Sequence, residues 1–172
     1  MKTRFLFLTL AFCFSVQLIA QNTNTIPDDE PEFLPEPIEF VYDMEGYFSS
    51  DELKRFRDTA ASFETETGNE VILLIFKHTA EFEDLETFAY MMGNEMNPGK
   101  EGKSNGVAIV YCTELNDLEI VPMEGAKKII TDKFIYTLKE KKINPLLENE
   151  QALQALQLTL EEIIKKWPKE KS

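Results

Sequence analysis

The sequence contains few of the residues on which common hydrolytic and redox mechanisms depend. It has 2 cysteines and 1 histidine among 172 residues. Cys13 lies in an apolar N-terminal segment, so removal of that segment would leave Cys112 alone and exclude an intrachain disulfide. Cys112 ends an apolar run without a basic neighbour, so we expect a buried, unreactive thiol. His78 has no ligand-spaced neighbour, which disfavours a serine–histidine–aspartate triad and a histidine-rich zinc site.

Basic residues are also scarce. The chain has 18 Lys and Arg against 31 Asp and Glu, a net charge of −13 at pH 7. Loss of Lys2 and Arg4 with an N-terminal signal would leave 16 basic residues against 31 acidic ones, or −15. Such a chain repels nucleic acid and anionic lipid surfaces. We therefore expect no nucleic-acid partner, while the surplus carboxylates could hold divalent cations or simply keep the surface solvated.

The glycine motifs of nucleotide binding are missing. The 7 glycines form no G-x-G-x-x-G. Residues 99–104 resemble a phosphate-binding P-loop, but two residues separate the glycines where that motif needs four. This loop also follows a helical pattern and opens a strand, the reverse of the order that places phosphate at a helix N-terminus. We therefore expect no nucleotide ligand.

The only long apolar stretch lies at the N-terminus. A basic start precedes residues 5–19, which are almost wholly apolar, and Ala20 offers a small residue before a polar segment. This pattern predicts a signal peptide over residues 1–20, cleaved near Ala20, and hence a periplasmic or secreted protein. A lipid anchor at Cys13 is the alternative, which the bulky Phe12 disfavours. We expect the mature chain not to be transmembrane, because no second stretch has membrane-spanning length.

Residues 21–37 are rich in proline and acid. Four prolines alternate with five acidic residues, and no basic residue is present. Because proline stiffens the backbone and like charges repel, an extended, solvated linker is expected, with an acidic metal-binding tail as the alternative. Folded sequence begins near Ile38, and residues 38–168 predict one domain of ordinary size.

Apolar periodicity in this domain predicts alternating strands and helices. The expected strands are 38–42, 71–76, 107–112 and a return strand 118–121; the expected helices run from Ser49 to Gly68, from about 83 to 96, from 126 or 131 to 141, where Asn144-Pro145 breaks the pattern, and over 149–167. Strands 71–76 and 107–112 are apolar throughout, which indicates burial on both faces. Strands separated by helices call for parallel pairing. The expected fold class is α/β, a three-layer α/β/α sandwich with a small mixed, mostly parallel sheet.

Three polar side chains lie in loops next to these elements: Asp43, Asn105 and Asp132. If their loops meet at one sheet edge, two carboxylates and an amide oxygen would suit Ca²⁺ or Mg²⁺. The alternative is that Asp43 makes a turn and Asp132 caps or charges a helix N-terminus. The residues alone leave both interpretations open.

Several motifs of the chain together resemble TPM domains. They are Asp43-x-x-Gly46-x-Phe48-Ser49, Thr67-Gly68-x-Glu70-Val71, Phe88-Ala89, Gly99-Lys100-x-Gly102-Lys103-x-Asn105-Gly106-Val107 and Thr131-Asp132. The resemblance covers about residues 38–147 and implies an extracytoplasmic α/β/α domain. The family includes thylakoid lumen proteins linked to photosystem II repair and bacterial envelope proteins. It is associated with acid phosphatase activity and divalent-cation binding in some members and with scaffolding or assembly in others. Its acidic loop cluster would map onto Asp43, Asn105 and Asp132.

The chain departs from the TPM pattern at positions that bear on catalysis. Ser104 stands where many members have Asp, a basic residue is missing near Leu118, and Met123 replaces a glycine. A site that stabilises a phosphoryl group needs cations or N–H donors, and these changes remove some of them. We therefore predict a binding or assembly module with an envelope or membrane protein partner, and a metal-assisted acid phosphatase as the alternative. Whether the chain is an enzyme stays open, as do partner, substrate, metal and oligomeric state.

Overall fold

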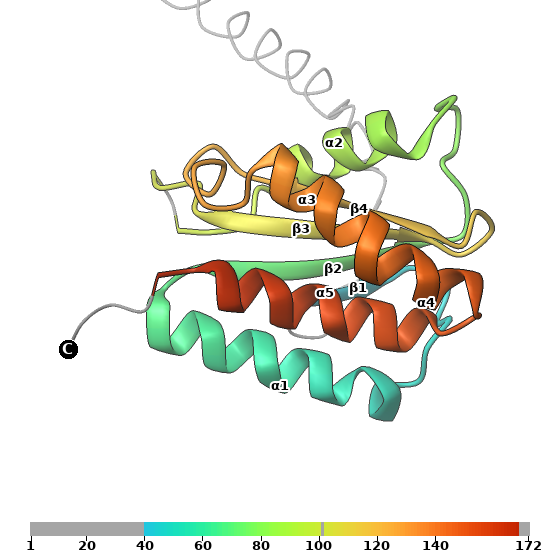
Figure 1. Cartoon of the computed structure of the whole chain (residues 1–172), viewed down its shortest axis with the longest axis horizontal. Helices are drawn as coiled ribbons and strands as arrows, with labels where there is room; N and C mark the ends of the chain where they lie inside the picture. The colour runs from blue at the N-terminus through green and yellow to red at the C-terminus, as the bar shows by residue number, and fades with distance from the viewer. Residues whose placement is uncertain (1–39, 101, 169–172) are drawn as a thin grey trace, which may run out of the picture. The chain divides into compact units, whose positions relative to one another are not determined.

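The computed structural model describes residues 40–100 and 102–168 (Figure 1). The predicted signal peptide over residues 1–20, Cys13 and the linker 21–37 lie outside these residues. The elements in chain order are β1 (Val41–Asp43), α1 (Ser50–Thr67), β2 (Glu70–Phe76), α2 (Leu85–Met96), β3 (Gly106–Cys112), β4 (Asp117–Pro122), α3 (Asp132–Leu138), the π-helix η1 (Lys139–Ile143), α4 (Asn144–Glu148) and α5 (Ala152–Lys166). None of the helices in this part of the chain has the length and apolar character needed to span a membrane.

The four strands form one sheet in the order β1-β2-β3-β4. β1, β2 and β3 run parallel, whereas β4 returns antiparallel to β3. The prediction of a mixed, mostly parallel sheet is confirmed. β1 and β4 are the two edge strands of this sheet, so one long side of β4 has no strand partner among the described residues.

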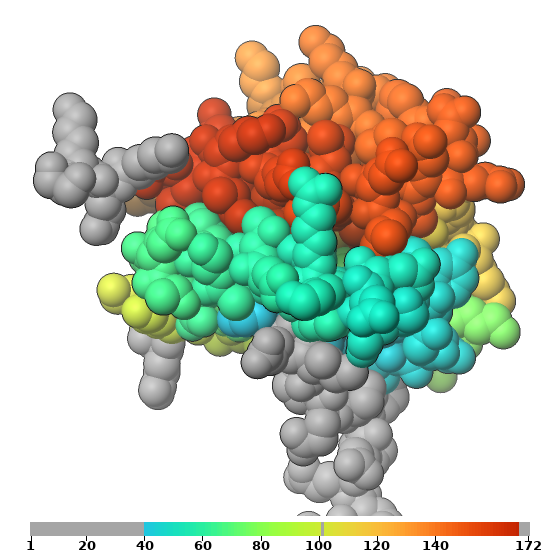
Figure 2. Space-filling model, turned by 90° about the horizontal axis from the view of Figure 1, so that it is seen from below, coloured from blue at the N-terminus to red at the C-terminus, as the bar shows by residue number. Residues whose placement is uncertain are grey.

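Helices cover both faces of the sheet, which confirms the α/β/α layers. Alternate side chains of β2 and β3 pack on one face with α1 and with the C-terminal helices, and on the other face with α2. Figure 2 shows α1 and α5 side by side on the first face. The buried positions of α1 are Leu53, Phe56, Ala60 and Phe63, which recur at helical spacing and form its inner face.

The ends of α1 follow the predicted capping residues. The Ser49 side chain accepts a hydrogen bond from the Glu52 N–H, and the Glu52 carboxylate accepts one from the Ser49 N–H, which is the reciprocal capping box. Gly68 ends the helix at φ +66°, a conformation that glycine adopts without steric cost. This turn places Gly68 and Asn69 directly before β2.

Two boundaries differ from the sequence prediction. β1 begins only at Val41, because Phe40 has a left-handed backbone (φ 63°) that extended pairing does not accept. The chain also stays helical through Asn144-Pro145. The Asn144 N–H donates to the Lys139 C=O across the wide turn of η1, and Pro145, which has no N–H to place, lies in the first turn of α4. Proline therefore starts a turn of helix here instead of ending one.

Candidate functional site: a groove along the edge strand β4

The three predicted cation ligands do not meet. Asp43 lies at the carboxyl end of β1, level with Ile75, whereas Asn105 immediately precedes β3, level with the start of β2 at Glu70. Five steps along β2 separate these levels, about 16 Å at the rise of a strand. Asp132 begins α3, beyond β4. The expectation that all three share one pocket is wrong. The carboxyl end of β1 and the amino end of β3 lie at opposite ends of the parallel strands.

Asp43 and Asp132 have the contacts of the alternative interpretation. The Asp43 carboxylate accepts hydrogen bonds from the N–H groups of Tyr47 and Phe48, at 3.0 and 2.9 Å, and so fixes the turn into α1. Asp132 is the first residue of α3, and the preceding Thr131 caps that helix through its hydroxyl group. A carboxylate in the first helical turn interacts favourably with the helix dipole and so stabilises the helix.

Asn105 ties the glycine-rich loop to the turn between α1 and β2. Its side-chain oxygen accepts the Lys100 N–H at 2.9 Å, while its amide nitrogen donates to the Gly68 C=O at 2.9 Å and to the Asn69 side chain at 2.7 Å. The Gly99 N–H donates to the Glu70 carboxylate in the same corner. The Asn105 amide and the N–H groups of Gly99 and Lys100 are thus engaged within this corner.

The remaining reactive side chains match their predicted surroundings. Cys112 is buried, and its sulfur lies 3.3 Å from the Lys77 C=O. His78 is exposed and accepts the Ala80 N–H in a local turn. Over residues 40–100 and 102–168, no three His, Cys, Asp or Glu side chains gather closely enough to hold a metal ion. Amide and backbone oxygens can also bind cations, so the Ca²⁺ or Mg²⁺ site remains a prediction from the family resemblance.

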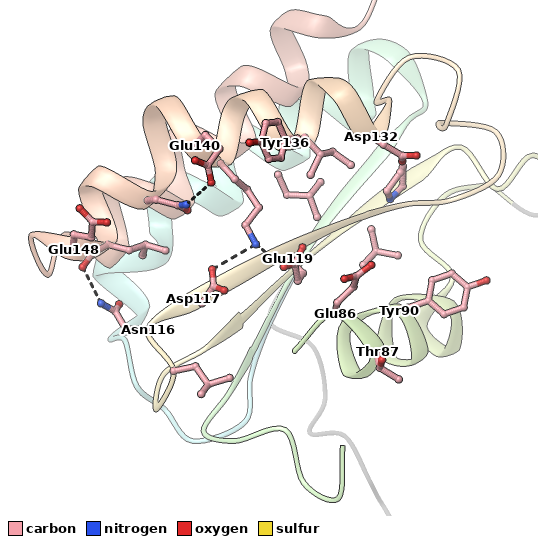
Figure 3. Close-up of a pocket in the computed structure, with 18 of the residues that line it drawn as sticks. Glu86, Thr87, Tyr90, Asn116, Asp117, Glu119, Asp132, Tyr136, Glu140 and Glu148 are labelled. Atoms are coloured by element: carbon pink, nitrogen blue, oxygen red, sulfur yellow. Dashed lines mark hydrogen bonds and ion pairs between the residues drawn. The ribbon is translucent and has the colours of Figure 1, made fainter. Parts of the chain in front are cut away.

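A groove of about 1140 Å³ runs along the outer side of β4 (Figure 3). Its lining residues extend from Asn116, just before β4, through Pro122, the last residue of the strand, to Lys127 beyond it. Six strand residues span about 20 Å. The groove therefore follows the whole length of β4 on its outer edge.

One wall of the groove is α2. Asp84 caps this helix by accepting the Thr87 N–H, and Leu85, Phe88, Ala89 and Met92 bury its inner face. Gly93 brings the helix close to β4, since a Cβ at this position would lie 3.0 Å from the Val121 side chain. Glu86 and Tyr90, one helical turn apart, consequently face the groove.

The opposite wall is α3 with η1. Asp132, Tyr136 and Glu140 recur at four-residue spacing and line the groove on the far side of β4 from α2. Tyr136 is 68% exposed and Tyr90 is 60% exposed, and Leu115 at the end of the groove is 55% exposed. Large apolar side chains gathered in the open are typical of an interaction surface.

The floor of the groove is the outer edge of β4. The Met123 N–H donates to the Gly106 C=O, and with the observed register this makes the pairs at Leu118, Ile120 and Pro122 non-hydrogen-bonded. The backbone groups of these three residues therefore point away from β3 and into the groove. Pro122 has no N–H, and the Asp117 carboxylate accepts the Leu118 N–H at 2.7 Å. What remains free among the described residues is the Ile120 N–H and the three carbonyl oxygens.

Negative charge dominates the groove. Its carboxylates are Glu86, Asp117, Glu119, Asp132, Glu140 and Glu148, and its cations are Lys127 and Lys139. Both lysines are already paired, Lys127 with Glu124 and Lys139 with Glu119 and Asp117. Burial raises the pKa of Glu119 above its ordinary value, and the neighbouring Lys139 only partly offsets this rise.

The Lys139–Glu119 pair leads to a pH-dependent prediction. Lys139→Met leaves the half-buried Glu119 carboxylate without its cation, so we expect a loss of about 1–3 kcal/mol of unfolding free energy at pH 7. Burial alone then raises the folded-state pKa of Glu119. A carboxyl with a raised folded-state pKa contributes stability below the unfolded pKa and loses it as the pH rises through the folded pKa. Urea unfolding should therefore show a smaller loss at pH 4 than at pH 7.

Lys127 provides the matched control, because it also lines the groove and pairs with a carboxylate, but at an exposed position. Exposed ion pairs contribute little to stability. Lys127→Met should leave the unfolding free energy nearly unchanged at both pH values. An equal effect of the two substitutions would contradict the role assigned to burial of Glu119.

The groove was not predicted from the sequence. The residues that form it are spread over α2, β4, α3 and η1, and nothing in their local pattern reveals that β4 is an edge strand with helices on both sides. The signal that the sequence does contain is Pro122, because a proline either ends a strand or lies on an edge strand.

Fold and groove together define a small α/β/α domain with an open groove beside the edge strand β4. The chain belongs to the TPM domain family, whose model matches residues 41–166. No curated protein matches the sequence.

Solved structures share this fold at low sequence identity. The N-terminal domain of a protein from P. gingivalis has a TM-score of 0.66 and 13% identity, with 74% of this chain and 81% of that chain covered. The BA42 protein from the psychrophilic bacterium Bizionia argentinensis has a TM-score of 0.59 and 21% identity, covering 74% and 89%. The N-terminal domain of the cg2496 protein from Corynebacterium glutamicum has a TM-score of 0.58 and 16% identity, covering 80% and 86%.

Proposed function

We propose that this chain is an extracytoplasmic binding or assembly module, and that it binds a partner protein of the envelope through the groove along β4. The observation that supports this most directly is the outer edge of β4, which pairs with no other strand in the described part of the chain and lies between the exposed rings of Tyr90 and Tyr136. Aromatic residues are enriched where proteins bind one another, since they bury much area at little entropic cost. An exposed pair of this kind on a free strand edge suits recognition of another chain.

Phosphomonoester hydrolysis is not favoured by any contact in the groove. A phosphoryl group would face six carboxylates, and the two lysines are engaged by carboxylates of this chain. The alternative is tested by assaying the purified protein on an aryl phosphate, with and without Ca²⁺ or Mg²⁺. Turnover that Asp132→Asn abolishes without unfolding the protein would replace the binding proposal by the enzymatic one.

The binding proposal is tested by site-specific photocrosslinking in cells that produce the full chain. We expect a photoreactive phenylalanine analogue at position 90 or 136 to give an adduct of defined mass with an envelope protein. The matched control is position 47, a tyrosine of similar exposure (54%) near the carboxyl end of β1 that does not line the groove. Adducts from all three positions alike, or from position 47 alone, would contradict the assignment of the groove.

A further inference from the structure

We propose that the occupant of the groove is an extended, basic segment of another protein, which adds to β4 as a fifth strand of the sheet. This inference rests on the proposed function and names the chemistry of the partner. Addition of a strand to a free sheet edge takes its affinity from main-chain hydrogen bonds and its specificity from pockets for alternate side chains. The groove supplies both.

The backbone on the floor of the groove offers four hydrogen-bonding groups. An incoming antiparallel residue opposite Ile120 can accept from the Ile120 N–H and donate to the Ile120 C=O. Its neighbours two positions away on either side then donate to the carbonyl oxygens of Leu118 and Pro122. The two positions that lack a free donor, at Leu118 and Pro122, limit pairing to this short stretch. Such a limited edge accepts one short strand and discourages open-ended pairing.

The walls of the groove suit the alternating side chains of a strand. Successive side chains of an added strand would point toward α2 and toward α3 in turn. Tyr90 offers apolar surface on the α2 side, and Tyr136 offers it on the α3 side, with Ile135 also lining the groove there. A volume of about 1140 Å³ along a six-residue strand also exceeds what most small-molecule sites need.

Charge selects a basic occupant. Four of the six groove carboxylates, Glu86, Asp132, Glu140 and Glu148, have no ion pair among the described residues, and they come from both walls and the far end. A lysine or arginine side chain on an added strand would meet a carboxylate whichever wall it faced. Complementary charge raises the rate of association and excludes partners of the wrong sign.

The same charges argue against the two nearest alternatives. Residues 21–37 of this chain carry five acidic residues and no basic one, so the groove repels them. A second copy that paired β4 with β4 would form a two-fold interface and bring like carboxylates against one another. Neither the chain's own linker nor a symmetric dimer therefore fits the groove as well as a basic strand does.

In the unbound protein, Lys139 forms ion pairs with the two carboxylates of β4 that a basic partner would contact. It reaches from η1 to the carboxylates of Glu119 and Asp117 on β4, at 2.5 and 3.5 Å, and so occupies the carboxylates beside the edge that the partner needs. A basic side chain of the partner can replace it beside Glu119, which keeps that half-buried carboxylate neutralised. Exchange of one cation for another makes the edge selective for basic strands, since any other strand would leave Glu119 unpaired.

Binding of peptide probes to the purified full chain tests the inference. The first probe is a short peptide of alternating Val and Lys, the second has Glu in place of Lys, and the third has the first sequence with two consecutive central amides N-methylated. Fluorescence polarisation at low salt should show binding of the first probe, and weaker binding by about tenfold or more for each of the others. The second probe loses charge complementarity. Of two consecutive amides one faces β4, so the third probe loses that hydrogen bond and places a methyl group against the strand edge.

Variants of the protein locate the binding. Glu86→Lys should lower the affinity for the first probe by about tenfold at low salt. Glu95→Lys is the matched control, because Glu95 lies on the same helix but outside the groove, and it should leave the affinity unchanged. Lys139→Met should raise the affinity for the first probe severalfold, because the peptide no longer has to displace Lys139 from Glu119 and Asp117. If that variant does not fold, the pair at positions 86 and 95 decides the question.

The outcomes separate this inference from the proposed function. Equal binding of the methylated probe would overturn strand addition, and equal binding to Glu86→Lys would overturn the groove as its place. If the crosslinks from positions 90 and 136 persist while the basic probe fails to bind, the groove is a partner site whose occupant is not a basic strand. If crosslinks and probe both fail, the proposed function is wrong as well.

Discussion

Gly106→Ala should cost about 3 kcal/mol or more of unfolding free energy, because overpacking against rigid backbone leaves the new atom no room. A Cβ at this position would lie 2.3 Å from the Pro98 carbonyl oxygen and 2.4 Å from its carbon. These are backbone atoms of the loop after α2, packed against the first residue of the buried strand β3, and they cannot turn aside as a flexible side chain could. Urea unfolding of the two proteins measures the difference.

Gly102→Ala is the control in the same loop. Gly102 has a left-handed backbone (φ 75°), yet a Cβ there would meet nothing within 4 Å. The cost is then conformational only, about 1–2 kcal/mol. If both substitutions cost the same, the close approach of Pro98 to Gly106 does not exist in solution.

The glycine-rich loop is important for the groove although it does not line it. The Gly106 C=O accepts the Met123 N–H, and the Ser104 C=O accepts the Gly125 N–H at 2.8 Å. A Cβ on Gly125 would lie 2.3 Å from the Lys103 carbonyl oxygen, so the two segments are in close contact. The loop thereby holds the segment that leads from β4 to α3, the second wall. The most recognisable motif of the sequence therefore positions one wall of the groove without lining it.

Local rules predicted the elements of this fold well. Ser49 with Glu52 predicted the start of α1, Gly68 predicted its end, and the unbroken apolar runs predicted the two central strands. Each of these depends on neighbours along the chain, so the sequence contains the information directly. The prediction failed at Asn144-Pro145 because a π-helical turn, which local propensity does not reveal, accommodates the proline.

The site was predicted poorly because it depends on which ends of the strands come together. Asp43 is the last residue of β1, whereas Asn105 immediately precedes β3. In a parallel sheet these two positions lie at opposite ends of the strands. Chain order alone was sufficient to exclude their meeting once parallel pairing was predicted. The groove needed more, namely the strand order and the docking of α3 beside β4, which arise from contacts distant in sequence.

Asn105→Asp should cost about 2–4 kcal/mol, because two hydrogen bonds are lost and a carboxylate is left facing two oxygens. The Lys100 N–H can still donate to a carboxylate, but the second oxygen would oppose the Gly68 C=O and the Asn69 side-chain oxygen. The orientation of the native amide follows from these partners, since only nitrogen can donate to a carbonyl oxygen. Urea unfolding in the presence of chelator should show the full loss.

The same variant separates the structural role of Asn105 from a ligand role, because the two make opposite predictions when Ca²⁺ is added. A structural amide gains nothing from the cation, so the loss should persist at saturating Ca²⁺. A cation ligand would gain a charge on conversion to Asp, and the bound cation would stabilise the native state by mass action. Asn94→Asp, at an exposed position on α2 where water can replace the amide contact to Tyr90, should cost much less in either condition. Recovery of stability by Ca²⁺ in Asn105→Asp alone would show that the oxygens around position 105 hold a cation, and the assignment of this amide as a purely structural tie would be wrong.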